Sequence, residues 1–174
     1  MPAITYMVEA RTDALTGLLN RRAFNDLVSA TPLQGSRSII LFDLDFFKAL
    51  NDRHGHAFGD DVLRRFASVC RNSLRTQDIA ARVGGEEFAV VLEGCPVERA
   101  LVVGNRIRLS FAKQTILCGR ERIRCTVRVG VYGSPFGETM TFEELYSTAG
   151  VTLYAAKEAG RNRVCRYRAE MQVA

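Results

Sequence analysis

The sequence predicts an α+β fold, in which a mixed, mainly antiparallel sheet is flanked by helices. Apolar segments joined by short turns at Gly84-Gly85 and at Gly119-Arg120 are typical of β-hairpins. Segments with apolar residues at helical spacing alternate with these strands. No G-x-G-x-x-G follows a strand and no G-x-x-x-x-G-K-[ST] occurs, so Rossmann and P-loop folds are not expected. The expected order αβααββαββαβ predicts helices packed on a sheet.

The first half of the chain is divided by turn-forming residues. Residues 1–12 lack a clear pattern and are expected to be a linker remnant, and Thr31-Pro32 and Gly35 end the first helix. The expected segments are a turn over 13–20, a helix over 21–30, a buried strand over 38–44, a helix over 46–53, a loop over 55–59, and a helix capped by Asp60 or Asp61 and running to Leu74.

The second half is expected to hold two hairpins and two helices. Pro96 begins a helix, and Gly160 ends another that starts at Phe142. Residues 122–132 alternate between apolar and mostly charged side chains, which predicts one long strand. A short strand over 163–167 follows, so residues 13–170 are expected to form one domain, with residues 171–174 as a tail.

The composition narrows the class of protein. The chain has 174 residues, of which 47% are hydrophobic, and this suits one compact domain. Five scattered cysteines without a C-x-x-C motif predict reduced thiols in a cytoplasmic protein. No segment predicts a membrane span or a signal peptide. The net charge of +5 is dispersed and lacks interleaved aromatic residues, so a nucleic-acid polymer is not the expected partner.

The most informative motif is Gly84-Gly85-Glu86-Glu87, at the turn of the first hairpin. A turn has no structural need for two adjacent carboxylates, which repel each other, whereas a divalent cation beside a phosphate does need oxygen ligands. The glycines allow the backbone to approach a bulky ligand. Asp43 and Asp45 lie at the end of another apolar strand, so Asp43 and Glu86 converge on one metal if the two strands are neighbours. For Asp43 alone, a strand-end turn residue is the alternative.

Several polar residues follow Asp43 within a short helix and loop. Asn51 and Asp60 are able to bind guanine, and Lys48, Lys157 and Arg161 to neutralise phosphates. A charged helix C-terminus is the alternative for Lys157 and Arg161, and ordinary loop hydrogen bonding is the alternative for His54 and His56. A zinc site is not expected, because the chain has no further histidine.

In combination, these motifs resemble those of the GGDEF family, the catalytic domain of bacterial diguanylate cyclases. The resemblance extends from Asp13 to the last strand. The matching segments are Asp13–Arg22, Phe42–Lys48, Asn51–Asp60, Arg82–Phe88 and Leu153–Asn162. It implies a palm-like fold similar to that of adenylyl cyclases and polymerases. It also implies the condensation of two GTP into cyclic di-GMP, with release of two pyrophosphates, by an antiparallel homodimer.

The resemblance also implies site residues. The metal, Mg²⁺ or alternatively Mn²⁺, would be held by Asp43, by Leu44 through its carbonyl, and by Glu86, which is also the expected base for the 3′-hydroxyl. The GTP-binding residues would be Asn51 and Asp60 at guanine, His56 near the nucleoside, and Lys48, Lys157 and Arg161 at the phosphates. Gly84, Gly85 and Glu87 belong to the signature, and the role of Glu87 stays open.

A second site is implied by Arg75-Thr-Gln-Asp78. By itself this segment is an ordinary helix end, but R-x-x-D at this offset resembles the family's product-inhibition site. Arg75 and Asp78 would bind cyclic di-GMP, with Arg106 as an accessory arginine. Family members usually carry an N-terminal sensory or receiver domain, and the short leader predicts a fragment or a stand-alone domain, whose parent protein could be attached to a membrane.

Two positions depart from the family pattern. Gly150 stands where A-D-x-A-L-Y normally has Asp, and Arg128 stands where T-V-S-x-G normally has Ser. Both put local packing in question, and neither is expected to touch the metal ligands. Two other functions stay open: a degenerate domain that senses GTP or cyclic di-GMP without catalysis, and a structural dimerisation domain. The first would be expected to lack a signature acid, and none is missing.

Overall fold

The computed structural model of the chain describes residues 11–30, 36–134 and 141–167. The linker remnant expected up to residue 12 lies outside the described residues except for Arg11 and Thr12. The tail expected over 171–174 and the residues expected to end the first helix, within 31–35, also lie outside them. Among the described helices, none is long and apolar enough to cross a membrane.

The described elements follow the expected order with two differences, a two-residue strand before the first helix and the division of the strand expected over 122–132 into two. They are β1 (Leu19–Asn20), α2 (Arg21–Ala30), β2 (Arg37–Leu44), α3 (Phe47–His54), α4 (His56–Asn72), β3 (Ile79–Arg82), β4 (Glu87–Glu93), α5 (Val97–Ala112), β5 (Ile116–Cys118), β6 (Glu121–Ile123), β7 (Val127–Gly133), α6 (Phe142–Glu158) and β8 (Val164–Arg166).

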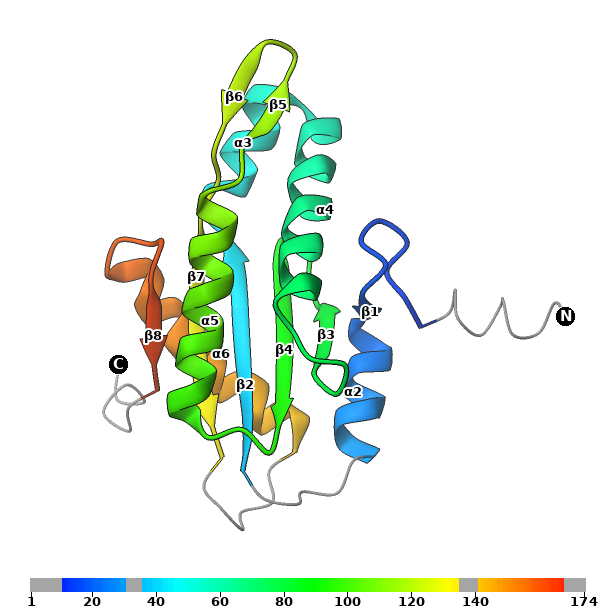
Figure 1. The fold of residues 1–174 in the computed structure, drawn as a ribbon, viewed down its shortest axis with the longest axis vertical. Helices are drawn as coiled ribbons and strands as arrows, with labels where there is room; N and C mark the ends of the chain where they lie inside the picture. The colour runs from blue at the N-terminus through cyan, green and yellow to red at the C-terminus, as the bar shows by residue number, and fades with distance from the viewer. Residues whose placement is uncertain (1–10, 31–35, 135–140, 168–174) are drawn as a thin grey trace, which may run out of the picture.

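The main sheet has six strands in the order β1-β3-β4-β2-β7-β8 (Figure 1). β2 is antiparallel to both β4 and β7, and β3 is antiparallel to β4. The strands at the two edges, β1 and β8, pair in parallel with β3 and β7. The prediction of a mixed, mainly antiparallel sheet flanked by helices is therefore confirmed.

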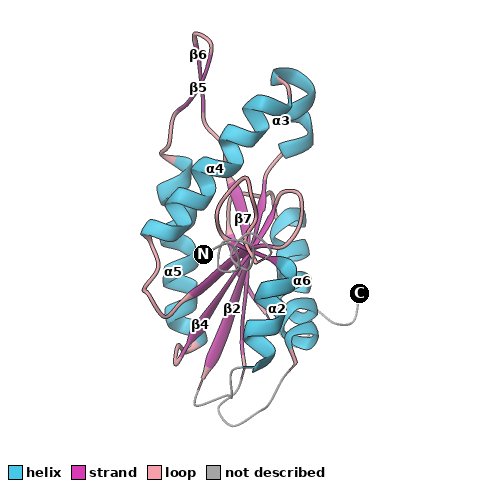
Figure 2. Cartoon of the chain, turned by 90° about the vertical axis from the view of Figure 1, so that its right-hand side faces the viewer, coloured by secondary structure: helices cyan, strands magenta, loops and turns pink. Residues whose placement is uncertain are grey.

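Helices cover both faces of this sheet, as the side view in Figure 2 makes clear. β2 is buried along its whole length, because a strand covered on both faces needs apolar side chains in both directions. Ile40 and Phe42 face the core formed with α4 and α5, where the Phe66 ring lies 5.3 Å from that of Phe42. Ile39 and Leu41 face the second core, formed with α2 and α6.

The prediction of a loop over 55–59 is wrong, because α4 already begins at His56. Gly55, with φ of 85°, alone separates α3 from α4. Gly59 lies inside α4, where it packs against α3. A Cβ at this position would overlap the side-chain amide of Asn51 on α3. Asp60 and Asp61 are therefore helix-interior residues and not caps. The two helices approach closely, which places Asn51 beside the first turns of α4.

The prediction of one long strand over 122–132 is also wrong, since this segment divides into β6 and β7. Within the described part of the chain, β6 pairs only with β5, in a separate two-stranded sheet. The hairpin projects beyond the main sheet (Figure 1). Between the two strands, the carbonyl of Thr126 accepts a hydrogen bond from Asp45 N at 2.9 Å. The chain thus leaves the hairpin to pair with the end of β2.

Candidate active site

Three charged residues form a row across the sheet at the end of β2. Asp43 lies opposite Glu87 of β4 on one side and opposite Arg128 of β7 on the other. Residues directly opposite in antiparallel strands point to the same face. In this row they face α6, and together with Tyr146 and Lys157 they line a cavity of about 250 Å³. Tyr146 was not predicted from the sequence, because its place beside the carboxylates depends on how α6 packs on the sheet.

The glycine turn brings Glu86 to the same place. Leu44 N donates a hydrogen bond to the carbonyl of Glu86 at 3.2 Å, which ties the end of β2 to the turn. Gly84 lets the Glu87 carboxylate lie close to the turn, because a Cβ would lie 2.7 Å from Oε2 of Glu87 and would displace that side chain. The expectation that the strands carrying Asp43 and Glu86 are neighbours is confirmed. This pairing places Asp43, Leu44 and Glu86 side by side.

An arginine holds this turn from outside. Arg82 donates two hydrogen bonds to the carbonyl of Gly85, at 2.7 and 3.1 Å. Its guanidinium also forms an ion pair with Asp13 at 3.2 Å. Burial alone would raise the pKa of Asp13, but hydrogen bonds from Thr16 and the charge of Arg82 bring that pKa below its ordinary value. Asp13 thus supports the turn through Arg82, a contact that the sequence does not indicate.

Arg128 does touch one candidate metal ligand, Asp43, so the expectation that it would touch none is wrong. Its guanidinium lies 2.8 Å from Oδ1 of Asp43 and 3.3 Å from Oδ1 of Asp45. The reason is the register, which sets Arg128 directly across from Asp43. The alternation of the strand gives the face on which Arg128 lies, but only the pairing of β7 with β2 reveals its partner.

Two carboxylates of the site, those of Asp43 and Glu86, have raised pKa values. Burial, followed by the charges of Glu86, Glu87 and Asp45, raises the pKa of Asp43 to about 7, against the opposing effect of Arg128. Burial and the neighbouring charge of Glu87 also raise the pKa of Glu86, and Arg128 again opposes the shift. Such paired shifts at one cluster are typical of functional sites.

Asp45 has a structural role next to Asp43. Its Oδ2 accepts hydrogen bonds from the Thr126 hydroxyl at 2.7 Å and from Asn162 N at 3.0 Å. The second contact fixes the loop after α6, in which Arg161 and Asn162 both have positive φ. This loop is thereby held against the end of β2.

The predicted phosphate-binding cations lie near that end from different elements. The Arg161 guanidinium stacks on the Phe46 ring, 4.6 Å from its centre, at the start of α3. Lys157, in the last turn of α6, is exposed and lines the same cavity as Asp43. Lys48 is exposed in the first turn of α3. The structure brings Lys157 close to the carboxylates, whereas Arg161 is placed near them only through Phe46, and Lys48 only by the position of α3 after β2.

The predicted guanine-binding residues lie on α3 and α4. Oδ1 of Asn51 is buried and, among the described residues, has no hydrogen-bond partner. Asp60 is half-buried in α4, and His56 is exposed at the first residue of that helix. An unsatisfied buried amide oxygen is costly unless a ligand or water completes it.

The donor set at the sheet end suits a hard divalent cation. Asp43 and Glu86 supply carboxylates, and Leu44 supplies a neighbouring backbone carbonyl. Among the described residues, no group of three or more His, Cys, Asp or Glu side chains is arranged to hold a metal. A cation here would therefore need oxygen atoms from substrate or water, as Mg²⁺ commonly does. The buried Oδ1 of Asp43 has the Arg128 guanidinium as an ionic neighbour. It accepts no hydrogen bond of good geometry from the residues that the structure describes, so a lone pair is left for a cation.

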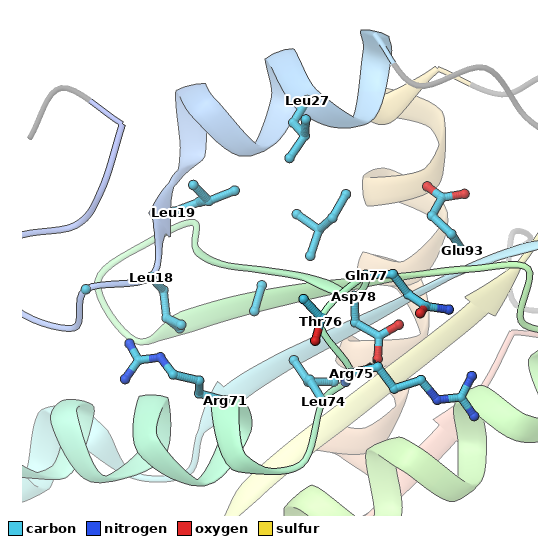
Figure 3. A pocket seen from close by; sticks show the side chains of 13 residues that line it. Leu18, Leu19, Leu27, Arg71, Leu74, Arg75, Thr76, Gln77, Asp78 and Glu93 are labelled. Carbon is cyan, nitrogen blue, oxygen red and sulfur yellow. Dashed lines mark hydrogen bonds between the residues drawn. The ribbon is translucent and has the colours of Figure 1, made fainter. Parts of the chain in front are cut away.

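The three residues of the predicted inhibitory site also meet. Arg75, Asp78 and Arg106 line one cavity of about 360 Å³. Asp78 accepts a hydrogen bond from Arg75 N at 2.9 Å, and Arg106 donates to the carbonyl of Ser73. Figure 3 shows Arg75 pointing away from the leucines of an adjacent hollow of about 750 Å³. The Arg75 side chain is thus exposed and available to a ligand.

Comparison with known proteins adds to this geometry. The sequence profile described as "Diguanylate cyclase, GGDEF domain" matches residues 10–163. The chain is 41% identical over 162 residues to the response regulator PleD of Caulobacter vibrioides, covering 89% of this chain and 36% of PleD. It is 39% identical over 160 residues to the diguanylate cyclase DgcS of Shewanella oneidensis, covering 89% of this chain and 52% of DgcS. The chain thus spans about half or less of the length of these relatives.

Solved structures give the same result. The GGDEF domain of DgcB from Caulobacter crescentus, in complex with c-di-GMP, superposes with a TM-score of 0.82 at 32% identity, covering 90% of this chain and 93% of that one. The active GGEEF domain of a diguanylate cyclase from Vibrio cholerae superposes with a TM-score of 0.78 at 34% identity, covering 87% and 98%. The fold of the described residues is therefore that of these domains.

Proposed function

Because the chain belongs to the GGDEF family of diguanylate cyclase domains, we propose that it condenses two GTP into cyclic di-GMP and releases two pyrophosphates. The observation that carries this proposal is the convergence of Asp43, the Leu44 carbonyl and Glu86 at the end of the central strand. The reaction joins the 3′-hydroxyl of one GTP to the α-phosphate of the other.

Asp43, Leu44 and Glu86 would hold Mg²⁺ or Mn²⁺. When bound, such an ion spreads the charge that develops on the phosphate and helps the attacking hydroxyl to ionise. The proposal rests on the donor types, since two carboxylates and a carbonyl are hard oxygen ligands.

Glu86 is the proposed base. Its raised pKa favours proton transfer near neutral pH, because a base is most effective when its pKa is close to the working pH. Its place in the turn, tied to Leu44, keeps the carboxylate at the sheet end. Glu87 faces Asp43 across the sheet and receives a long contact of 3.5 Å from the Tyr146 hydroxyl, so we assign it a supporting position in the site.

GTP would lie along α3 and α4. Asn51 and Asp60 would bind guanine, with His56 beside the nucleoside. Lys48, Lys157 and Arg161 would neutralise the phosphates. The start of α3, which has no side-chain cap, leaves backbone N–H groups for the same anion.

Catalysis would require two copies of the domain. One site holds one nucleotide and has only one set of carboxylates, so a cyclic product needs a second nucleotide presented from outside. We propose an antiparallel homodimer, in which each domain offers its GTP to the other. A cytoplasmic location, where GTP is available, accompanies this proposal.

Arg75, Asp78 and Arg106 would form a product-inhibition site. Their shared cavity supports this assignment. A guanidinium is well suited to bind a phosphate of cyclic di-GMP through two parallel hydrogen bonds. Asp78 is also engaged by Arg75 N, which fixes its carboxylate beside Arg75.

The test is an incubation with GTP and Mg²⁺, followed by mass spectrometry of the products. We expect cyclic di-GMP from the wild type, and a rate at least about a hundredfold lower from Glu86→Gln. Glu98→Gln is the matched control, because Glu98 forms an exposed ion pair with Arg166 on the surface. Equal rates for the wild type and Glu86→Gln would refute the role of Glu86.

The same assay separates the other two functions. A sensor would bind GTP or cyclic di-GMP without forming product at high protein concentration. A structural dimerisation domain would bind neither nucleotide. The complete set of polar residues at the site supports the cyclase over both.

A further inference from the structure

Arg128 is the cation that contacts the candidate metal ligand Asp43. Its side chain is only 11% exposed and contacts both Asp43 and Asp45. A guanidinium buried between two carboxylates is charged at all ordinary pH values and has little freedom to move away into water. It therefore belongs to the site and does not merely lie on the surface above it.

The charge balance of the site depends on this residue. Four carboxylates gather at the sheet end, from Asp43, Asp45, Glu86 and Glu87. The charge of Arg128 opposes the rise in the pKa of both Asp43 and Glu86. The exposed Lys157 opposes only the rise in the pKa of Glu86. Arg128 thus supplies the main positive charge that faces Asp43 in the chain itself.

The opposite wall of the cavity leaves room for this long side chain. Gly150 of α6 lines the cavity together with Arg128, and a Cβ added at Gly150 would meet no atom within 4 Å. The two positions that depart from the family pattern therefore face the same space. A Cβ at position 150 would not touch Arg128, so the two departures share the cavity without depending on each other.

We propose that Arg128 is a positioning residue that serves as a resident cation, holding the Asp43 carboxylate in place before metal binds and competing with the divalent cation for it. This inference rests on the metal site proposed above. A metal at Asp43 must share or displace the ion pair with Arg128, since both cations use the same carboxylate. Arg128 would thereby raise the metal concentration at which the site fills.

The test measures metal binding directly, with Mn²⁺ alone as the probe and water-proton relaxation as the readout. Removing one positive charge about 5 Å from a divalent ion changes its affinity on the order of tenfold in an aqueous dielectric, and by more at a buried site. We therefore expect Arg128→Met, which keeps most of the length of the side chain, to bind Mn²⁺ at least about tenfold more tightly than the wild type. Arg128→Lys, which keeps the charge, should stay within about threefold of the wild type on the same basis.

Arg64→Met is the matched control. Arg64 forms an ion pair with Asp61 of the same length, 2.8 Å, but on the exposed face of α4. Its Mn²⁺ affinity should equal that of the wild type. If Arg128→Met does not fold, Arg128→Gln removes the charge while it retains a hydrogen-bond donor for Asp43.

The outcomes separate this inference from the proposed function. Equal or weaker Mn²⁺ binding by the neutral Arg128 variants would overturn the role of Arg128. Asp43→Asn tests the site itself, because its Mn²⁺ binding should be much weaker than that of the wild type. If Asp43→Asn binds Mn²⁺ as the wild type does, the proposed metal site is wrong.

Discussion

Replacing Asp43 with Asn should stabilise the metal-free protein at high pH. Burial raises the pKa of Asp43 to about 7 from an ordinary value of 3.8. Between these values the folded protein binds a proton that the unfolded chain has already released. The free energy of unfolding therefore falls as the pH rises through this window, and it stays reduced above pH 7. Asn resembles the neutral form of the side chain and avoids this loss.

The size of the effect follows from the pKa. A shift from 3.8 to about 7 corresponds to an upper bound of roughly 4 kcal/mol, at about 1.4 kcal/mol per pH unit. Asp43→Asn also removes the ion pair with Arg128, which offsets part of this gain. We therefore expect about 2 kcal/mol at pH 8, and almost no difference at pH 4.

The assay is urea denaturation of both proteins in EDTA, at pH 4 and at pH 8. Asp61→Asn is the control, because Asp61 is exposed and pairs with Arg64 on the surface. Its free energy of unfolding should differ little from that of the wild type at either pH. If Asp43→Asn is less stable than the wild type at pH 8, or if the difference does not change with pH, the argument from burial is refuted.

Two further predictions concern packing and inhibition. Gly130→Ala should lower the free energy of unfolding by about 2 kcal/mol or more, because its Cβ would lie 2.6 Å from Leu153 N of α6. Gly150→Ala, in α6, should raise the free energy of unfolding by up to about 1 kcal/mol, since it removes a helix-interior glycine without a clash. Urea denaturation measures both variants, and equal effects would contradict the packing argument. Arg75→Ala should weaken product inhibition by about tenfold or more, the value of a charge-assisted hydrogen bond, while the initial rate without product is unchanged. Unaltered inhibition in this variant, measured by adding cyclic di-GMP to the assay, would refute the assignment of Arg75.

Local patterns predicted most elements because strand and helix periodicity is a property of neighbouring residues. α2 begins and ends at the predicted residues, and the hairpin that carries Glu86 was predicted with its turn. The loop over 55–59 was wrong because Gly59 is needed for the approach of α4 to Asn51 on α3. No local pattern distinguishes a glycine that breaks a helix from one that allows two helices to pack.

The candidate site was predictable as a set of residues but not as a set of contacts. The acids at strand ends indicated that Asp43 and Glu86 converge, and the sheet order places them together. The contact of Arg128 with Asp43 depends on the pairing of β7 with β2, which joins positions far apart in the sequence. The support of the Gly85 carbonyl by Arg82 likewise requires the turn geometry.

Synthesis of cyclic di-GMP by two copies of the domain is tested by the initial rate of product formation, measured by mass spectrometry over a hundredfold dilution of the protein with GTP and Mg²⁺ in excess. We predict that cyclic di-GMP forms, and that the rate per chain falls as dilution separates the two copies. A rate per chain that stays constant through the dissociation of the dimer would contradict the two-copy mechanism. The absence of cyclic di-GMP at high protein concentration, with GTP bound, would contradict the cyclase itself.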